Sequence, residues 1–265
     1  MKSKRCTPKT WGYYWDVLGN LLVNMLDIKK GTSVLDVGTG GGSTLVPALA
    51  KVGMTGHVTG IDARDTSVRS MTTELNRCSI SNASVHVMQA EEMSFSDASF
   101  DFVVSGFIGW SRRFDFVKNK YTDQDLVMSE ILRVLKAGGK AGFSTWLFQE
   151  DSEWIMKLVQ PFHPSAPVGY SKETRAGWDM IMSNAGFTRY EISPVEIDYV
   201  YPSVDDWWEE MMSYGWQHTI EAIPAGDRPS LDDLRKTAIH SLEDHLTEAG
   251  GVTFKKSVLI AIGVK

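Results

Sequence analysis

The stretch that most constrains the fold of this chain is Val34–Gly42, which reads V-L-D-V-G-T-G-G-G. The apolar residues around Asp36 predict a short buried strand, and the glycines after it predict a turn with little side-chain cover. Glycine adopts positive φ and has no Cβ, so such a turn lets a ligand approach backbone N–H groups at the start of the next helix. Residues 43–51 favour that helix, with Ser43 as its expected N-cap.

The spacing of the glycines limits the classes of ligand that the turn could bind. A P-loop needs Gly-Lys-Ser/Thr, but no lysine occurs between Gly38 and Ala50, and a dinucleotide fingerprint needs a third glycine where this chain has Ser43. The alternating residues are Asp36, Gly38, Gly40 and Gly42. This D-x-G-x-G-x-G pattern resembles motif I of class I S-adenosylmethionine-dependent methyltransferases, whose loop passes beneath the methionine part of the cofactor. The alternative is a turn that only joins a strand to a helix.

The length and net charge of the chain limit its expected domain organisation and partners. The 265 residues suit one large α/β domain, and the net charge of −6 with a pI near 5.5 provides no basic surface for nucleic acid. We therefore expect no nucleic-acid partner, although tRNA stays open. No apolar run is long enough to span a bilayer, so we expect no membrane insertion. Cys6 and Cys78 are far apart and match no metal-site spacing, which predicts reduced thiols, no metal and a cytoplasmic protein.

A second motif supports the resemblance. His57–Asp62, H-V-T-G-I-D, predicts a short strand that ends in a carboxylate. In the family, an acid at this place accepts hydrogen bonds from both ribose hydroxyls, so the resemblance implies that Asp62, with Ala63 after it, binds the cofactor. The alternative role for an aspartate at a strand end is a helix cap.

A longer match follows the expected third strand, 85–89. Gln89–Val104 resembles a signature of the ubiquinone-biosynthesis-like branch of the family, typically D-A-E-x-L-P-F-x-D-x-S-F-D-V-V. The resemblance implies that Gln89, Ala90 and Glu91 face the adenine. Gln89 stands where the family usually has aspartate, but its side-chain oxygen can still accept from the adenine amino group. For Glu91 a solvated acidic turn is an equal alternative.

The exit of the expected fourth strand, 100–105, forms the next part of the site. Ligands of open parallel sheets bind at the carboxyl ends of strands, and the resemblance puts the reactive methyl group near Ser105, Gly106 and Trp110. Arg112 and Arg113 follow, and we interpret them as part of a solvated loop rather than as contacts to an anionic acceptor.

The last matching stretch is E-I-L-R-V-L-K-A-G-G-K, Glu130–Lys140. We expect Thr122-x-x-Asp125 to cap its helix and Gly138-Gly139 to end it. The resemblance then covers about residues 21–146. It implies a single α/β domain over 1–265, with a Rossmann-like seven-stranded, mostly parallel sheet, an antiparallel last strand, helices on both faces and a helical cap. About 21–146 would be the cofactor-binding half, and about 147–256 would include substrate-cap insertions.

Aromatic residues outside the motifs suggest where an acceptor binds. An amphipathic helix is expected over Thr10–Leu26, where Tyr14 would contact the cofactor and Trp15 the acceptor. A further helix after Ser203 carries more tryptophans. The acceptor candidates there are Trp207, Trp208 and Trp216, although packing alone accounts for any single one of them. His163 and His218 are weak candidates for a general base.

The expected reaction is in-line methyl transfer from S-adenosylmethionine to a small, partly apolar molecule. Two other classes share these motifs: a protein that binds the same cofactor but catalyses a non-methylating reaction such as cyclisation, and a module that senses the cofactor without turnover. An NAD-dependent oxidoreductase is a more distant alternative. The sequence leaves the acceptor atom and the oligomeric state open.

Overall fold

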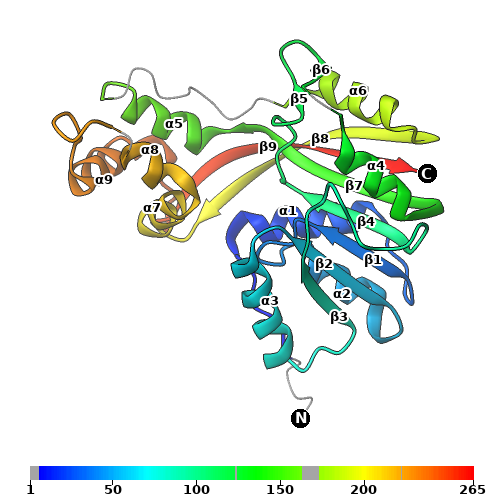
Figure 1. Cartoon of the computed structure of the whole chain (residues 1–265). Coiled ribbons are helices and arrows are strands. Elements are labelled where there is room, and N and C mark those ends of the chain that lie inside the picture. Colours follow the sequence, from blue (N-terminus) through cyan, green and yellow to red (C-terminus); the bar gives the residue numbers. More distant parts are fainter. Residues whose placement is uncertain (1–5, 123, 163–172, 222) are drawn as a thin grey trace. The chain divides into compact units, whose positions relative to one another are not determined.

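The computed structural model describes residues 6–122, 124–162, 173–221 and 223–265 (Figure 1). The helices are α1 Tyr13–Met25, α2 Leu45–Val52, α3 Asp65–Arg77, α4 Leu126–Val134, α5 Glu150–Val159, α6 Arg175–Ala185, α7 Val204–Met211, α8 Gln217–Glu221 and α9 Leu231–His240. The strands are β1 Ser33–Val37, β2 His57–Asp62, β3 Ala83–Val87, β4 Phe100–Gly106, β5 Phe114–Asp115, β6 Lys120–Tyr121, β7 Leu135–Gln149, β8 Arg189–Tyr201 and β9 Val252–Val264.

Seven strands form one sheet in the order β3-β2-β1-β4-β7-β9-β8, and β5 and β6 form a separate hairpin. The pairs β2–β3, β1–β2, β1–β4 and β4–β7 are parallel, and the last strand, β9, is antiparallel. This confirms the predicted fold class. The chain order reverses at β1, which lies between β2 and β4. The carboxyl end of β1 is therefore a switch point of the kind at which open α/β sheets bind ligands.

The described residues divide into two compact units. Unit 1 lies within 1–145, 173–194 and 259–265, and unit 2 lies within 146–172 and 195–258. Strands β7, β8 and β9 each contribute residues to both units. In unit 1, α1, α2 and α3 bury apolar side chains against β1, β2 and β4 in one core cluster. That core fixes the carboxyl ends of the strands that carry the motifs.

Some element boundaries differ from those that the sequence predicts. Helix α4 ends at Val134, before the two glycines, because Leu135 already pairs with Phe100 as the first residue of β7. The capping box is also wrong: Asp125 is the N-cap, and its carboxylate accepts from the Met128 amide at 3.0 Å. Pairing between strands therefore overrides local helix signals here.

The helix after the glycine turn also begins differently. Its N-cap is Thr44 rather than Ser43, and no side chain caps it. The Thr44 hydroxyl donates to Asp36 instead, at 2.7 Å, while Ser43 donates to Asp16 in α1 at 2.8 Å. Strand β3 ends at Val87, which leaves Gln89 in the loop that follows.

The prediction of two reduced thiols is wrong, because a disulfide joins Cys6 to Cys78. It connects the segment before α1 to the end of α3, 72 residues away in the sequence. Arg77 strengthens this connection by donating to the Thr7 carbonyl at 3.0 Å. The cysteines thus no longer support a cytoplasmic location, which stays a prediction. Within the described ranges, none of the helices has the length and apolar character needed to cross a bilayer.

Candidate active site

The glycine turn after β1 has the conformation that its sequence predicts. Gly38, Gly40 and Gly42 have φ values of +77°, +48° and +81°, in the region that favours glycine. The amides of Gly38 and Thr39 both donate to the Ile61 carbonyl of β2 at 2.9 Å. The turn is therefore fixed to the neighbouring strand, while its glycines place no side chains of their own over the main chain.

Asp36, near the end of β1, stabilises this turn through hydrogen bonds. Its carboxylate is fully buried and accepts from the hydroxyls of Thr39 at 2.8 Å and Thr44 at 2.7 Å. Burial raises the pKa of Asp36 to about 6, although both hydrogen bonds oppose the shift. Asp36 thus links the turn to the start of α2, and its predicted contribution to the cofactor site is through that turn.

Asp62 joins the first two motifs. Its Oδ2 accepts from the Gly40 amide at 2.9 Å, and its Oδ1 accepts from the Arg64 amide at 2.8 Å. Each carboxylate oxygen can accept a second hydrogen bond, so capacity for a ligand hydroxyl remains. Ala63, the next residue, is exposed. The alternative role of Asp62 as a helix cap is not observed, because Arg64 is the N-cap of α3 and no side chain caps that helix.

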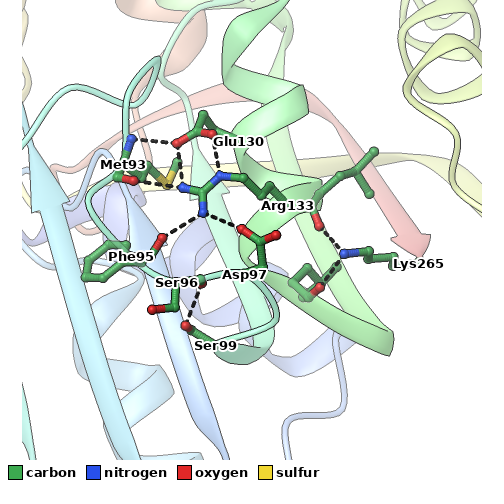
Figure 2. Close-up of polar contacts among 10 residues, drawn as sticks. Met93, Phe95, Ser96, Asp97, Ser99, Glu130, Arg133 and Lys265 are labelled. Atoms are coloured by element: carbon green, nitrogen blue, oxygen red, sulfur yellow. Dashed lines mark hydrogen bonds and ion pairs between the residues drawn. The ribbon is translucent and has the colours of Figure 1, made fainter.

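The segment after β3 is held in place by α4 (Figure 2). Arg133 donates to the carbonyls of Met93 at 2.8 Å and Phe95 at 2.7 Å and to the Asp97 carboxylate at 2.9 Å. Glu130 pairs with Arg133 and accepts from the Met93 amide at 2.6 Å. This pair was missed as part of the site, because the sequence places it more than 30 residues from the segment that it fixes.

The residues predicted to face the adenine lie at the start of that segment. Gln89 is exposed, and Ala90 and Glu91 are partly buried. Glu91 forms an ion pair with Arg113, which also donates to the Gly109 carbonyl at 3.3 Å. Arg113 is thus engaged with the chain's own carboxylate, and it links the segment after β3 to the loop after β4.

That second loop, 107–113, which we call the post-β4 loop, lies against the glycine turn. Before it, the buried Ser105 hydroxyl donates to the Val37 carbonyl at 3.1 Å, and Gly106 ends β4. A Cβ added at Gly38 would lie 2.3 Å from the Ile108 Cγ2 atom. Trp110, predicted to contact the acceptor, is 1% exposed and packs on Phe143 and Trp178. The loop thus covers the turn and anchors itself in the core.

The start of the described chain covers the other side of the turn. A Cβ added at Gly41 would lie 2.3 Å from the Trp11 ring. Tyr14 is buried, and Trp15 is partly buried with its ring 5.5 Å from that of Phe107. The sequence analysis placed Trp11 within the expected helix 10–26 and gave it no role at the site, but α1 begins only at Tyr13, which leaves Trp11 in the segment before it.

The remaining predicted residues belong to unit 2. Trp207 and Trp208 are 0% and 8% exposed, and Trp207 packs between Trp154 and Phe254. Trp216 lies in a π-helical segment and is partly buried. His218 belongs to α8, but its side chain is not described, and His163 lies outside the described residues. The structure therefore assigns neither histidine to the site.

Unit 2 also contains a buried ionisable cluster that the sequence analysis missed. Lys256 of β9 and Asp151 of α5 are an ion pair at 2.5 Å with fully buried side chains, and Tyr201 donates to Asp151 at 3.3 Å. Glu210 of α7 is 2% exposed, and neither of its oxygens has a hydrogen-bond partner among the described residues. Its burial raises the pKa of Glu210 to about 8, with Lys256 opposing and Asp151 adding to the shift.

Comparison with known proteins identifies a related family. The family described as "Methyltransferase domain" matches residues 28–161, which are 134 of the 265 residues. A demethylmenaquinone methyltransferase from Listeria welshimeri is 30% identical over 118 residues, which are 44% of this chain and 46% of that protein. The match thus spans a little under half of the relative's length.

Solved structures share the fold over nearly the whole chain. A putative type II methyltransferase from Anaeromyxobacter dehalogenans aligns with a TM-score of 0.64 and 16% identity, covering 97% of both chains. The [4+2]-cyclase SpnF aligns with a TM-score of 0.54 and 19% identity, covering 94% of this chain and 80% of that one. At these identities the likeness concerns the fold alone.

Proposed function

The chain belongs to the methyltransferase-domain family, and we propose that it transfers the sulfonium methyl group of S-adenosylmethionine to a small, partly apolar acceptor. The observation that carries the proposal is the hydrogen bond from the Gly40 amide to Asp62. It brings an acid suited to ribose hydroxyls next to bare main chain suited to the methionine part.

The residues present fit this cofactor. The glycines of the turn hold positive φ, so no Cβ obstructs the approach of a ligand to the backbone. Asp62 retains acceptor capacity for the ribose, and the Ala90 amide with the Gln89 side chain would face the adenine edge. Glu130 and Arg133 fix the segment that carries these last two residues.

Bound S-adenosylmethionine supplies a methyl group that its positive sulfur has already activated. The contribution of the chain is then to hold the acceptor in line and to exclude water. The Trp11 ring and the Ile108 side chain lie against the glycine turn, and the Trp15 ring packs on Phe107 next to Ile108; these groups would provide that exclusion. The proposal assigns no general base, since neither His163 nor His218 has a described side chain.

Acceptor selection is proposed for unit 2. The matched family region ends at residue 161, so most of unit 2 lies outside it. Unit 2 is rich in tryptophan, which suits an acceptor with an apolar body. The relative from Listeria welshimeri is named for a demethylmenaquinone acceptor, which has the same general character. Because β7, β8 and β9 pass through both units, we propose that the units act as one domain.

A second candidate is a non-methylating reaction on the same cofactor-binding fold. The alignment with a [4+2]-cyclase supports this second candidate, because a protein with the same fold is named for ring-forming chemistry. The two candidates predict the same cofactor site but different products.

The test has two steps. Titration calorimetry with S-adenosylhomocysteine should show one binding site per chain, and no detectable binding would overturn the proposal. The protein is then incubated with methyl-labelled S-adenosylmethionine and a panel of quinones, phenols and amines. Transfer of label to a panel member supports methyl transfer, whereas binding without label transfer, together with a new unlabelled product, supports the second candidate.

A further inference from the structure

A buried glutamate behind the post-β4 loop accepts four hydrogen bonds. Glu173, just before α6, is 2% exposed. Its Oε1 accepts from the amides of Trp110 at 2.7 Å and Ser111 at 3.3 Å. Its Oε2 accepts from the Thr145 hydroxyl at 2.7 Å and the Trp178 indole N–H at 2.9 Å. A carboxylate is acceptor-only, so this set of donors suits it.

The two oxygens of Glu173 serve different parts of unit 1. Oε2 is bonded to side chains of β7 and α6, which are regular elements of the unit. Among the residues that the structure describes, Oε1 is bonded only to main-chain amides of the post-β4 loop. Hydrogen bonds to an ionised acceptor are stronger than neutral ones, so Glu173 connects an irregular loop firmly to the rigid scaffold.

The loop has a conformation that needs such support. Phe107 has a φ of +55°, and Gly109 has a φ of +75°. A non-glycine residue in the left-handed region costs energy and persists only where its surroundings hold it. The same part of the loop carries Ile108, which lies against Gly38 of the turn, and Phe107, which packs on Trp15. Loosening the loop would therefore disturb the wall of the proposed cofactor site.

We propose that Glu173 is a positioning residue for the cofactor site: by binding the amides of Trp110 and Ser111 it holds the post-β4 loop against the glycine turn. This inference rests on the proposed function. The residue lies outside every motif that the sequence analysis used, and it acts through the loop rather than by touching the cofactor.

The experiment compares two variants of the full chain. Glu173→Gln keeps the size of the side chain but removes its charge and leaves one acceptor oxygen in place of two, so the loop amides either lose their partner or keep only a weaker, neutral one. Thr145→Val keeps the shape of the side chain, removes one donor to Oε2 and leaves both loop amides bonded. Because Thr145 is buried, this second variant costs stability without removing a contact to the loop, and it serves as the matched control.

Three quantities are measured: hydrogen exchange of peptides covering 107–113 in the ligand-free protein, affinity for S-adenosylhomocysteine well below the melting temperature, and the melting temperature itself. We expect Glu173→Gln to speed exchange of the loop at least tenfold and to weaken affinity about tenfold. Thr145→Val should lower the melting temperature but keep the wild-type exchange of the loop and the wild-type affinity. Should Glu173→Gln fail to fold, Glu173→Asp, which keeps the anion but shortens its reach, replaces it with the same expectation.

The outcomes separate the two proposals. If the wild type binds S-adenosylhomocysteine and Glu173→Gln binds it equally well, Glu173 has only a structural role and the inference is overturned. Equal losses of affinity in both variants would also overturn it, because affinity would then follow stability. If the wild type itself does not bind S-adenosylhomocysteine, the proposed function fails and the positioning role fails with it. If the wild type binds but the loop of Glu173→Gln exchanges as slowly as in the wild type, Glu173 does not hold the loop, and the proposed function is unaffected.

Discussion

The two units bury carboxyl groups in different ways. In unit 1, Asp36 and Glu173 each accept hydrogen bonds from hydroxyl, amide or indole donors, and no described cation contacts either of them. In unit 2, Asp151 pairs with a buried lysine, and Glu210 has no hydrogen-bond partner among the described residues. The first unit therefore uses buried acids to fix loops and turns, and the second uses them in an ionisable cluster.

This difference matters because the two arrangements respond to different changes. A carboxylate held by neutral donors fixes the backbone geometry around it and loses its effect when a donor is removed. A buried ion pair depends on both partners, since removal of one leaves an uncompensated charge. We expect unit 1 to be sensitive to changes in shape at the cofactor turn and unit 2 to be sensitive to changes in charge.

The largest effect should come from breaking the ion pair of unit 2. In Lys256→Met the buried Asp151 loses its cation, and we expect the free energy of unfolding to fall by about 4 kcal/mol. Urea denaturation measures this loss. Lys29→Met in unit 1 is the control, because its pair with Asp27 is exposed to solvent and should contribute little to stability. Equal losses in both variants would remove the contrast between the units.

The second test uses pH to probe Glu210. Its pKa in the folded chain is about 8, above the ordinary value of 4.5, so the stability associated with its bound proton is present at low pH and is lost as the pH rises toward 8. Glu210→Gln cannot titrate. Between about pH 5 and pH 9 we expect the unfolding free energy of the variant to gain about 3 kcal/mol relative to wild type, a figure reduced for screening by solvent.

The matched control for Glu210 is Glu209→Gln on the same helix. Glu209 is exposed, so this change should leave the pH dependence of the wild type intact. Denaturant unfolding at several pH values measures both variants. A wild-type profile as flat as that of Glu210→Gln would show that Glu210 titrates normally.

At the glycine turn we expect an added side chain to reduce cofactor affinity strongly. In Gly40→Val a branched side chain would have to adopt a φ of +48°, with its Cβ 2.6 Å from the Trp11 ring. Affinity for S-adenosylhomocysteine should fall at least 100-fold, about 2.7 kcal/mol, by calorimetry. Gly226→Val in unit 2 is the control, because a Cβ there meets no atom within 4 Å. Normal affinity in Gly40→Val would contradict the proposed geometry of the turn.

The smallest of these effects concerns the ribose acid. Asp62→Ala removes the proposed acceptor of the ribose hydroxyls and the partner of the Gly40 amide, so affinity for S-adenosylhomocysteine should fall about 30-fold, roughly 2 kcal/mol. Asp65→Ala, at an exposed position three residues later in the first turn of α3, should bind as wild type does. An unchanged affinity in a folded Asp62→Ala protein would exclude Asp62 from the site.

Much of unit 1 could be predicted because its signals are local. The strand before the glycine turn, the acid that ends β2 and the buried face of α3 each follow from a few adjacent residues. The predicted helix ends were wrong where a residue distant in the sequence forms the hydrogen bond that a local cap or helix would have used. Ser43 and Thr44 bond to Asp16 and Asp36 rather than capping α2, and Leu135 joins the sheet instead of extending α4.

The sequence by itself determined the glycine turn and the acid that ends the next strand, because these depend on backbone conformation and periodicity within short stretches, and the fold class followed from the resemblance of these motifs to a known family. Only the tertiary structure decided the partners of buried charges. Glu173 meets Trp110 across 63 residues, Lys256 meets Asp151 across 105, and Cys6 meets Cys78 across 72. The physical reason is that a hydrogen bond or an ion pair depends on distance in space, and separation along the chain does not specify that distance until the strands have paired.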